Sequence, residues 1–487
     1  MLTMRNKAIG FVFATLMLWA TVTYLVIFYE STDTDEDKRA QLTLQIDKLE
    51  KELNLLIASN EKLIQELQLK YANKNDNFKT AFTDYVTEKE INLDKSQDSI
   101  IRSNNDQGKN VILPLSHNSN NTQQHDSRKD KVGDSKVNVE LINGQPVIAV
   151  LVISCNRVTV RRCLDQLIKF RPSSEQFPII VSQDCNHSQT SQVIESYGQK
   201  IIHIQQPDQS DIDVPPREKK FKGYFKIARH YGWALNQIFF KFGFKAAIIV
   251  EDDLDVAPDF FEYFLGTHPI LMSDPTLFCV SAWNDNGKAD LVDPSSPDLL
   301  YRTDFFPGLG WMLTKKLWQE LSQKWPKSYW DDWIRQPEQR KNRACIRPEL
   351  SRTRTFGKIG VSNGLFYEKH LQFIKLNENF VPFSRMNLTH LIKENYDLSF
   401  VNQVYKSEVI TYADLKKGKF NSPGSVRIPY HTRQTYKTTA KMLGLMDDFK
   451  SGVPRTGYRG IVSFFYNQRR VYLAPSASWS GYDLSWS

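Results

Sequence analysis

Apolar residues fill one uncharged stretch near the start of the chain, residues 8–29. A helix of this length rises about 33 Å, enough to cross a bilayer core about 30 Å thick. Arg5 and Lys7 precede the stretch, whereas acidic residues follow it. Basic flanks stay in the cytosol, and no small-residue cleavage site of a signal peptide follows. The pattern therefore predicts a cytoplasmic tail at 1–7, a signal-anchor at 8–29 and a type II orientation with the remainder in the lumen.

A heptad repeat comes next. Its d positions are Leu42, Leu49, Leu56 and Leu63, and its a positions are Ile46, Leu53, Asn60 and Leu67. This spacing predicts a coiled coil at about 42–69 through which the chain would form a homodimer. An amphipathic helix packed on something else fits the same pattern. Residues 71–140 are too polar to bury a core, so 30–145 is predicted to be a lumenal stem.

From residue 146 apolar runs alternate with helical patterns. Continuous apolar runs predict strands at 147–154, 177–182, 200–204 and 246–250, and a 3.6-residue period predicts helices at 158–170, 190–197 and 224–242. This alternation indicates an α/β fold with a mainly parallel sheet and helices on both faces. After about residue 394 the segments become shorter and richer in Tyr and Thr, which predicts a smaller, more β-rich domain.

The charge and the cysteine content indicate which partners and which cysteine chemistry to expect. The 63 basic and 55 acidic residues are interspersed, so a net charge of +8 does not indicate a nucleic-acid partner. None of the five cysteines has zinc-ligand spacing, and in an oxidising lumen two disulfides and one thiol are expected. Cys155 and Cys185 each follow the end of a neighbouring predicted strand, which puts them within bridging distance.

Three consecutive carboxylates, Glu251, Asp252 and Asp253, directly follow the strand at 246–250. Open α/β sheets bind ligands at this carboxyl edge, and a hard cation such as Mn²⁺ or Mg²⁺ would bridge such a carboxylate to a diphosphate. Consecutive residues point in different directions, so one or two of the three would reach the metal. A solvated acidic turn is the alternative. The same edge is expected to gather Arg157, Asp184 and His230.

A second carboxylate pair, Asp331 and Asp332, lies between Trp330 and Trp333. Indole faces stack on sugar rings while a carboxylate takes a hydroxyl proton, so the segment suits a sugar site. An exposed loop anchored by its aromatic residues fits equally well. The sequence at 360–364 matches the G-x-S-x-G pattern of serine hydrolases, but basic and polar residues precede it where that motif needs a buried strand.

Together these motifs resemble the N-acetylglucosaminyltransferase I family. The matching segments are ISCNR at 153–157, VSQDC at 181–185, KIARH at 226–230, VEDD at 250–253, WNDNG at 283–287, WDDW at 330–333 and LMDD at 445–448. The resemblance runs from about residue 146 to the end of the chain and does not cover the stem.

The resemblance implies a GT-A fold in the Golgi membrane. A nucleotide-sugar and metal-binding domain would span 146–357, a donor lid loop and linker 358–393, and a smaller domain 394–487. The implied reaction is the inverting, Mn²⁺-dependent transfer of GlcNAc from UDP-GlcNAc. Its acceptor would be the 2-hydroxyl of the α1,3-arm mannose in a five-mannose, high-mannose N-glycoprotein.

The resemblance also assigns residues. Asp253 would ligate Mn²⁺ and Asp331 would be the catalytic base. The nucleotide-sugar would contact Arg157, Asp184, His230, Glu251 and Asp252, with Ser362 in the loop that orders over it. The implied disulfides are Cys155–Cys185 and Cys279–Cys345, leaving Cys163 free. Asn363 departs from the family, whose members carry His there. A catalytically inactive sugar-binding or scaffold protein is the alternative function.

Overall fold

The computed structural model describes residues 141–486 apart from 143, 359, 362–363 and 365. The expected tail, signal-anchor and coiled coil lie outside the described residues, as do Ser362 and almost all of the stem. The described residues belong to one compact unit, which spans 129–487. No helix among them is long and apolar enough to cross a membrane.

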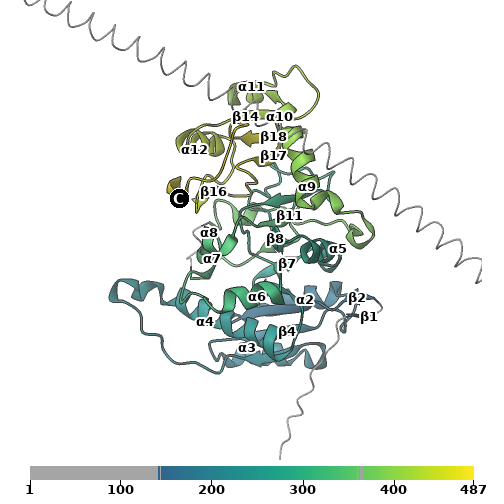
Figure 1. The fold of residues 1–487 in the computed structure, drawn as a ribbon. Coiled ribbons are helices and arrows are strands. Elements are labelled where there is room, and N and C mark those ends of the chain that lie inside the picture. The colour runs from purple at the N-terminus through teal and green to yellow at the C-terminus, as the bar shows by residue number, and fades with distance from the viewer. Residues whose placement is uncertain (1–140, 143, 359, 362–363, 365, 487) are drawn as a thin grey trace, which may run out of the picture. The chain divides into compact units, whose positions relative to one another are not determined.

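An eight-stranded sheet with the order β5-β4-β3-β6-β10-β8-β11-β9 forms the centre of this unit (Figure 1). The strands are β3 (Ala149–Ser154), β4 (Ile179–Gln183), β5 (Ile202–Gln205), β6 (Ala246–Glu251), β8 (Leu277–Ser281), β9 (Leu300–Thr303), β10 (Trp311–Thr314) and β11 (Ala344–Pro348). Strands β3 to β6 are mutually parallel, as predicted. Strand β10 is antiparallel to both of its neighbours, and β9 is antiparallel to β11, so the sheet is mixed at this end.

Helices cover both faces of the parallel half of the sheet. They are α2 (Val160–Phe170), α3 (Ser188–Glu195) and α4 (Lys222–Asn236), which a π-helical turn extends through Gln237–Lys241. Alternate residues of β3 enter two separate apolar clusters, because successive side chains of a strand point to opposite faces. Val150 packs in one cluster with Leu164 of α2, and Leu151 packs in the other with Ala228 of α4. The predicted helix positions and two-faced arrangement are therefore confirmed.

Shorter elements complete the edge of the sheet. Strand β7 (Leu254–Val256) pairs antiparallel with β12 (Thr353–Thr355), which brings the segment after β12 to the end of β6. The amide of Phe356 donates to the carbonyl oxygen of Asp253 over 2.9 Å. Along the chain, four α-helices follow β7 and precede β12: α5 (Phe260–Ser273), α6 (Lys315–Ser322), α7 (Trp330–Ile334) and α8 (Pro337–Arg340). A small hairpin, β1 (Leu141–Ile142) and β2 (Gln145–Pro146), precedes the sheet.

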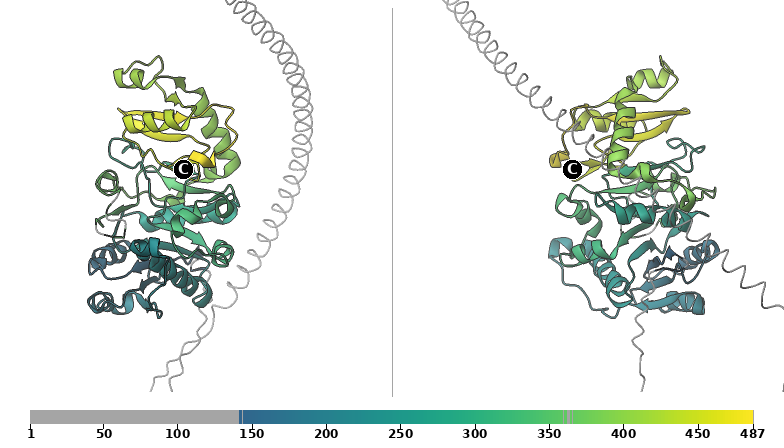
Figure 2. Two further views of the ribbon diagram at one scale, coloured as in Figure 1. Left: turned by 90° about the vertical axis from the view of Figure 1, so that its left-hand side faces the viewer. Right: turned by 45° about the vertical axis from the view of Figure 1, so that its right-hand side comes forward.

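A second sheet with the order β13-β14-β18-β17 has its own apolar cluster. Its strands are β13 (Glu408–Val409), β14 (Val426–Pro429), β17 (Val462–Tyr466) and β18 (Arg469–Ala474), accompanied by α11 (Tyr412–Lys417), α12 (Arg433–Met442) and the pair β15 (Phe449–Lys450) and β16 (Val453–Pro454). Figures 1 and 2 show it at the end of the unit away from α2 to α4. Residues of α9 (Lys393–Tyr396) and α10 (Asn402–Lys406) pack in the first cluster.

Candidate active site

The three carboxylates at the end of β6 differ in their surroundings, although Asp252 and Asp253 share Arg157 as a partner. Tyr231 of α4 donates its hydroxyl to Glu251 over 2.8 Å. Asp252 accepts from the Ser154 hydroxyl over 3.0 Å with Oδ2 and from Arg157 over 3.2 Å with Oδ1. Successive residues thus turn toward α4, toward β3 and toward the segment after β12, as expected of residues leaving a strand.

Asp253 has the most unusual surroundings of the three. Its Oδ2 accepts from Arg157 Nη1 over 2.5 Å. Its Oδ1 is buried and has no hydrogen-bond partner among the described residues. A Cβ atom on Gly357 would lie 1.9 Å from Oδ2, so only glycine lets the backbone approach the carboxylate this closely. Buried carboxylate oxygens are normally paired, and a free one suits a hard divalent cation. Asp253 therefore fits the metal-binding role. The described residues contain no group of three or more His, Cys, Asp or Glu side chains arranged to hold a metal.

Burial and neighbouring charges shift the pKa values of Glu251, Asp252 and Arg157. Burial and the nearby Asp253 carboxylate raise the pKa of Glu251 to about 7, although the Tyr231 hydroxyl opposes the shift. Burial also raises the pKa of Asp252 to about 6, against the lowering effect of Arg157. The pKa of Arg157 is raised because Asp253 and Asp252 outweigh its own burial. The cluster is thus short of positive charge, which is the condition that favours binding a cation.

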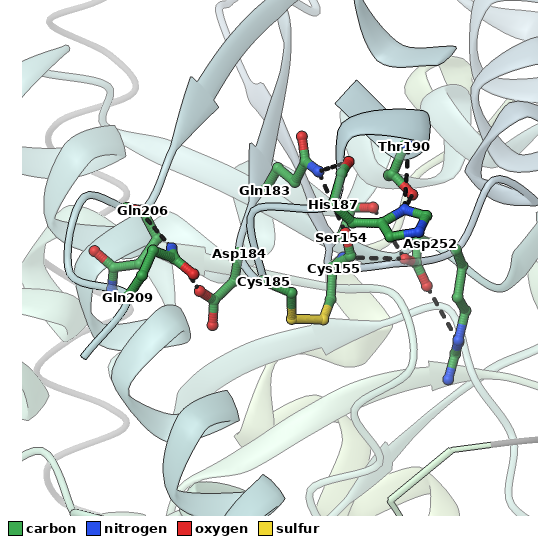
Figure 3. Close-up of a disulfide and its surroundings, with 11 residues drawn as sticks. Ser154, Cys155, Gln183, Asp184, Cys185, His187, Thr190, Gln206, Gln209 and Asp252 are labelled. Atoms are coloured by element: carbon green, nitrogen blue, oxygen red, sulfur yellow. Dashed lines mark hydrogen bonds and ion pairs between the residues drawn. A yellow bond between two sulfur atoms is a disulfide. The ribbon is translucent and has the colours of Figure 1, made fainter. Parts of the chain in front are cut away.

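A disulfide joins the carboxyl ends of β3 and β4 beside these groups (Figure 3). Cys155 and Cys185 have Cα atoms 5.2 Å apart. Cys185 has φ 68°, in the left-handed region, so the chain turns directly after β4 and Asp184. The buried Asp184 accepts from Gln209 over 3.0 Å on the other side of the bridge (Figure 3). The first disulfide is therefore present as the sequence led us to expect.

The second implied disulfide, Cys279–Cys345, is also present and joins the adjacent strands β8 and β11. Cys163 is the remaining thiol, and it is buried on α2. Both bridges and the free thiol agree with the pairing that the resemblance implies.

His230 of α4 lies at the same edge as Asp184. Its Nε2 is hydrogen-bonded to the Ser182 hydroxyl over 2.8 Å, and only 3% of the residue is exposed. Burial lowers the pKa of His230 to about 4, although Asp184 acts in the opposite direction. The imidazole is therefore neutral near pH 7 and can exchange hydrogen bonds with a ligand without carrying charge.

Asp331 and Asp332 lie on α7 and share one cation. Arg335 Nη1 is 3.0 Å from Asp331 Oδ2 and 3.0 Å from Asp332 Oδ1. Lys450 of β15 binds the other oxygen of Asp332, also over 3.0 Å. Despite its burial, the pKa of Asp332 is lowered, because Arg335 and Lys450 stabilise its charged form. The two neighbouring carboxylates are therefore not equivalent.

Tyr231 connects the two carboxylate groups. Its ring packs on Trp330, directly before Asp331, with 4.5 Å between ring centroids. Burial, Glu251, Asp253 and Asp331 together raise its pKa well above the usual value. The buried Tyr231 thus contacts Glu251 directly and also packs on Trp330, the residue before Asp331.

The structure brings most of the predicted residues together at one edge. Arg157 is in direct contact with Asp252 and Asp253, the adjacent Glu251 accepts from Tyr231, and Asp184 lies near His230. Ser362 lies outside the described residues. Sequence reasoning missed the roles of Tyr231, Arg335, Lys450 and Gly357. The i, i+4 spacing from Asp331 would have indicated Arg335, whereas the others depend on contacts between distant parts of the chain.

The edge that carries these groups is where open α/β proteins bind their ligands. The model of the GNT-I family matches residues 86–486, and the chain belongs to this family. A relative from Arabidopsis thaliana, alpha-1,3-mannosyl-glycoprotein 2-beta-N-acetylglucosaminyltransferase, is 40% identical over 331 residues. That alignment covers 67% of this chain and 74% of the relative.

Solved structures with a related arrangement are much more distant. The mannosyltransferase PcManGT from Pyrobaculum calidifontis, in complex with GDP-Man and Mn²⁺, is 14% identical with a TM-score of 0.23, over 36% of this chain and 47% of that one. TarS 1–349 from S. aureus is 15% identical with a TM-score of 0.30, over 42% and 58%. This chain therefore spans less than two thirds of either protein, and neither likeness carries an argument about function.

Proposed function

We propose that this protein is an inverting N-acetylglucosaminyltransferase. It would transfer GlcNAc from UDP-GlcNAc in β1,2 linkage to the α1,3-arm mannose of a five-mannose N-glycan, the step that begins hybrid and complex N-glycans. Membership of the GNT-I family and the name of the Arabidopsis relative support this reaction. The structural observation that carries it is that Tyr231 donates to Glu251 at the acidic end of β6 and packs on Trp330, which directly precedes Asp331. A donor bound at the end of β6 and an acceptor beside Asp331 would therefore lie next to each other.

The residues at the sheet edge would bind the donor. Asp253 has a free buried oxygen for a divalent cation such as Mn²⁺. When bound, this cation would neutralise the charge of the leaving diphosphate. Arg157 would supply further positive charge. The side chains of Asp184, Glu251, Asp252 and the neutral His230 would form hydrogen bonds with the hydroxyl groups and the nucleobase of the donor. Ser362 would lie in the loop that covers the donor.

Asp331 would act as the general base. It would take the proton of the acceptor 2-hydroxyl while that oxygen forms its bond to the anomeric carbon and the bond to UDP breaks. One displacement inverts the anomeric centre, so an α-linked donor gives a β-linked product. Asp332 is the less suitable base because both of its oxygens bind cations. A side chain already neutralised by Lys450 and Arg335 attracts a proton weakly.

The remaining assignments are proposals about the rest of the chain. Residues 8–29 would anchor the protein in the Golgi membrane as a single-pass type II protein, and the coiled coil at about 42–69 would form a homodimer. Residues 146–357, 358–393 and 394–487 would be the catalytic domain, the lid with its linker, and the smaller domain. The alternative, an inactive sugar-binding or scaffold protein, is disfavoured because Asp253 and Asp331 are both present.

The direct test is a transfer assay with the purified full-length protein, UDP-GlcNAc, Mn²⁺ and a five-mannose N-glycan. We expect one GlcNAc per glycan, with the product linkage assigned by NMR as β1,2 to the α1,3-arm mannose. A glycan that stays unmodified over many hours, with an active relative as positive control, would contradict the proposal. A product with an α-linkage would retain the substrate assignment and reject the inverting mechanism.

A further inference from the structure

Three aromatic side chains form a partly exposed cluster on one side of the site, which we call the aromatic wall. Tyr224 of α4 and Tyr329 stack with 4.8 Å between ring centroids and 26° between ring planes. Phe221 lies 6.5 Å from each of them. Phe221 is 37% exposed, and both tyrosines are partly exposed. Aromatic rings that remain accessible to solvent in a group are typical of binding surfaces.

The wall lies next to Asp331. Tyr329 directly precedes α7, and its carbonyl oxygen accepts from the amide of Trp333 over 2.9 Å. Tyr224 stacks on Tyr329, which is two residues before Asp331, and burial followed by the Asp331 carboxylate raises the pKa of Tyr224. Neither tyrosine hydroxyl donates a hydrogen bond to another described residue. Polar atoms and ring faces are thus both available beside the carboxylate.

The backbone of Tyr329 adopts a strained conformation in this cluster. Tyr329 has φ 50° and ψ 45°, the left-handed region that bulky residues rarely adopt. Such a conformation persists only where surrounding contacts hold it, and it often marks a functional site. In this conformation the Tyr329 ring stacks on Tyr224.

We propose that the aromatic wall binds the hexose ring of the acceptor whose hydroxyl approaches Asp331. This inference rests on the proposed function. Sugar rings present patches of C–H groups that pack on aromatic faces, while their hydroxyl groups need hydrogen-bond partners such as a tyrosine hydroxyl. The wall is next to Asp331, whereas the donor would be held by Asp253 and its neighbours at the end of β6. The acceptor sugar is therefore the ligand that suits it.

The aromatic wall also lies next to residues that pack against Val361, so it could support that contact instead of binding the acceptor. A Cβ atom on Gly223, next to Tyr224, would lie 2.8 Å from a methyl carbon of Val361. Val361 thus packs on the start of α4. If the wall served only to support Val361, changes to it would alter donor binding and leave acceptor binding as it is.

The test measures the KM values of both substrates for full-length variants. In Tyr224→Leu the ring is lost, and Tyr224→Phe loses only the hydroxyl. Tyr329→Asn removes the second ring and keeps a residue that tolerates the left-handed conformation. Phe373→Leu is the matched control, because Phe373 is 54% exposed and is not part of the wall. Melting temperatures show that each variant is folded.

We expect Tyr224→Leu and Tyr329→Asn to raise the KM for the five-mannose glycan about five- to tenfold, with the KM for UDP-GlcNAc within about twofold of wild type. Tyr224→Phe keeps the ring and loses one hydroxyl, so it should raise the acceptor KM less than Tyr224→Leu does. The control should stay within about twofold for both substrates. An unchanged acceptor KM, or a rise confined to the donor KM, would overturn the inference while leaving the proposed function intact. A wild-type protein that transfers nothing to the glycan would instead overturn the proposed function, and the inference with it.

Discussion

Lys450 and Asp332 form an ion pair between parts of the chain that are 118 residues apart, with 3.0 Å between Nζ and Oδ2. Lys450 belongs to the short strand β15, whereas Asp332 lies on α7 next to the proposed base. Arg335 binds the other oxygen of Asp332 as well as Asp331. Lys450 therefore influences how the single guanidinium is shared between the two carboxylates.

Replacing this lysine should lower turnover without unfolding the protein. In Lys450→Met, Asp332 would draw Arg335 closer and away from Asp331, which changes the orientation of the base. We expect kcat to fall about three- to tenfold, with little change in the KM for UDP-GlcNAc. The free energy of unfolding should change by less than about 1 kcal/mol, because the pair is partly exposed.

The matched control is Lys441→Met. Lys441 forms an exposed pair with Asp447 over 3.5 Å and has no contact with α7 in the described residues. Its kcat should equal that of wild type. If both lysine variants lose the same activity, a general effect of charge on this part of the molecule explains the result, and the link between Lys450 and the base is wrong.

The metal assignment predicts a specific loss at Asp253. Its buried Oδ1 has no protein partner, so Asp253→Asn removes a ligand charge without breaking a described hydrogen bond to that oxygen. We expect activity to fall at least about a hundredfold while the melting temperature stays close to that of wild type. Chelation of divalent ions should abolish transfer by the wild-type protein, and added Mn²⁺ should restore it. Full activity in the presence of chelator would reject the role of a metal.

The parallel half of the fold could be predicted because its strands are continuous apolar runs separated by amphipathic helices. Val150 and Leu151 illustrate the limit of that information, since the sequence marks both as buried but does not tell which face each one covers. The mixed half was not predicted. Strand β10 runs antiparallel between β6 and β8, and such pairing depends on distant partners rather than on local pattern.

In the candidate site, too, local sequence pattern predicted some features, whereas others depend on contacts between distant parts of the chain. The position of Glu251 to Asp253 at a strand end followed from the sequence, as did the contribution of Arg157. Asp331 and Asp332 could not be told apart, because they are adjacent and have identical side chains. The difference between them arises from Lys450, which becomes a neighbour only when β15 reaches α7. The approach of Gly357 to Asp253 likewise requires the pairing of β7 with β12.

The close contact between Gly357 and the Asp253 carboxylate predicts the effect of Gly357→Ala. The added methyl group would stand 1.9 Å from Asp253 Oδ2, so the carboxylate or the segment after β12 must move. We expect the Mn²⁺ concentration needed for half-maximal activity to rise about tenfold or more, since a displaced ligand binds the ion less well. Gly424→Ala is the control, because a Cβ atom there would meet nothing within 4 Å. Equal metal dependence in the two variants would contradict the prediction.

The thiol of Cys163 should be protected in the folded protein. Burial, followed by the nearby acidic residues, raises its pKa well above the usual value, and the thiolate is the reactive form. An alkylating reagent should add no label to the native full-length protein and one label after denaturation without reduction. Reduction should raise the count to five, the number of cysteines in the chain. Three labels without reduction would mean that one disulfide does not form.

The proposed base gives the most discriminating prediction. Asp331→Asn keeps the shape of the side chain and can still accept from Arg335, but it cannot take the proton of the acceptor hydroxyl. Turnover should fall at least about a hundredfold, the scale expected for a positioned base, while the KM for UDP-GlcNAc changes little. Asp332→Asn should retain much more turnover, because Asp332 already binds Arg335 and Lys450 and is poorly placed to accept a proton. Steady-state kinetics of the two variants, with a melting curve for each, would decide between the neighbours. If Asp332→Asn proved the slower enzyme, the proton would pass to Asp332, and Lys450 would have to leave it during the reaction.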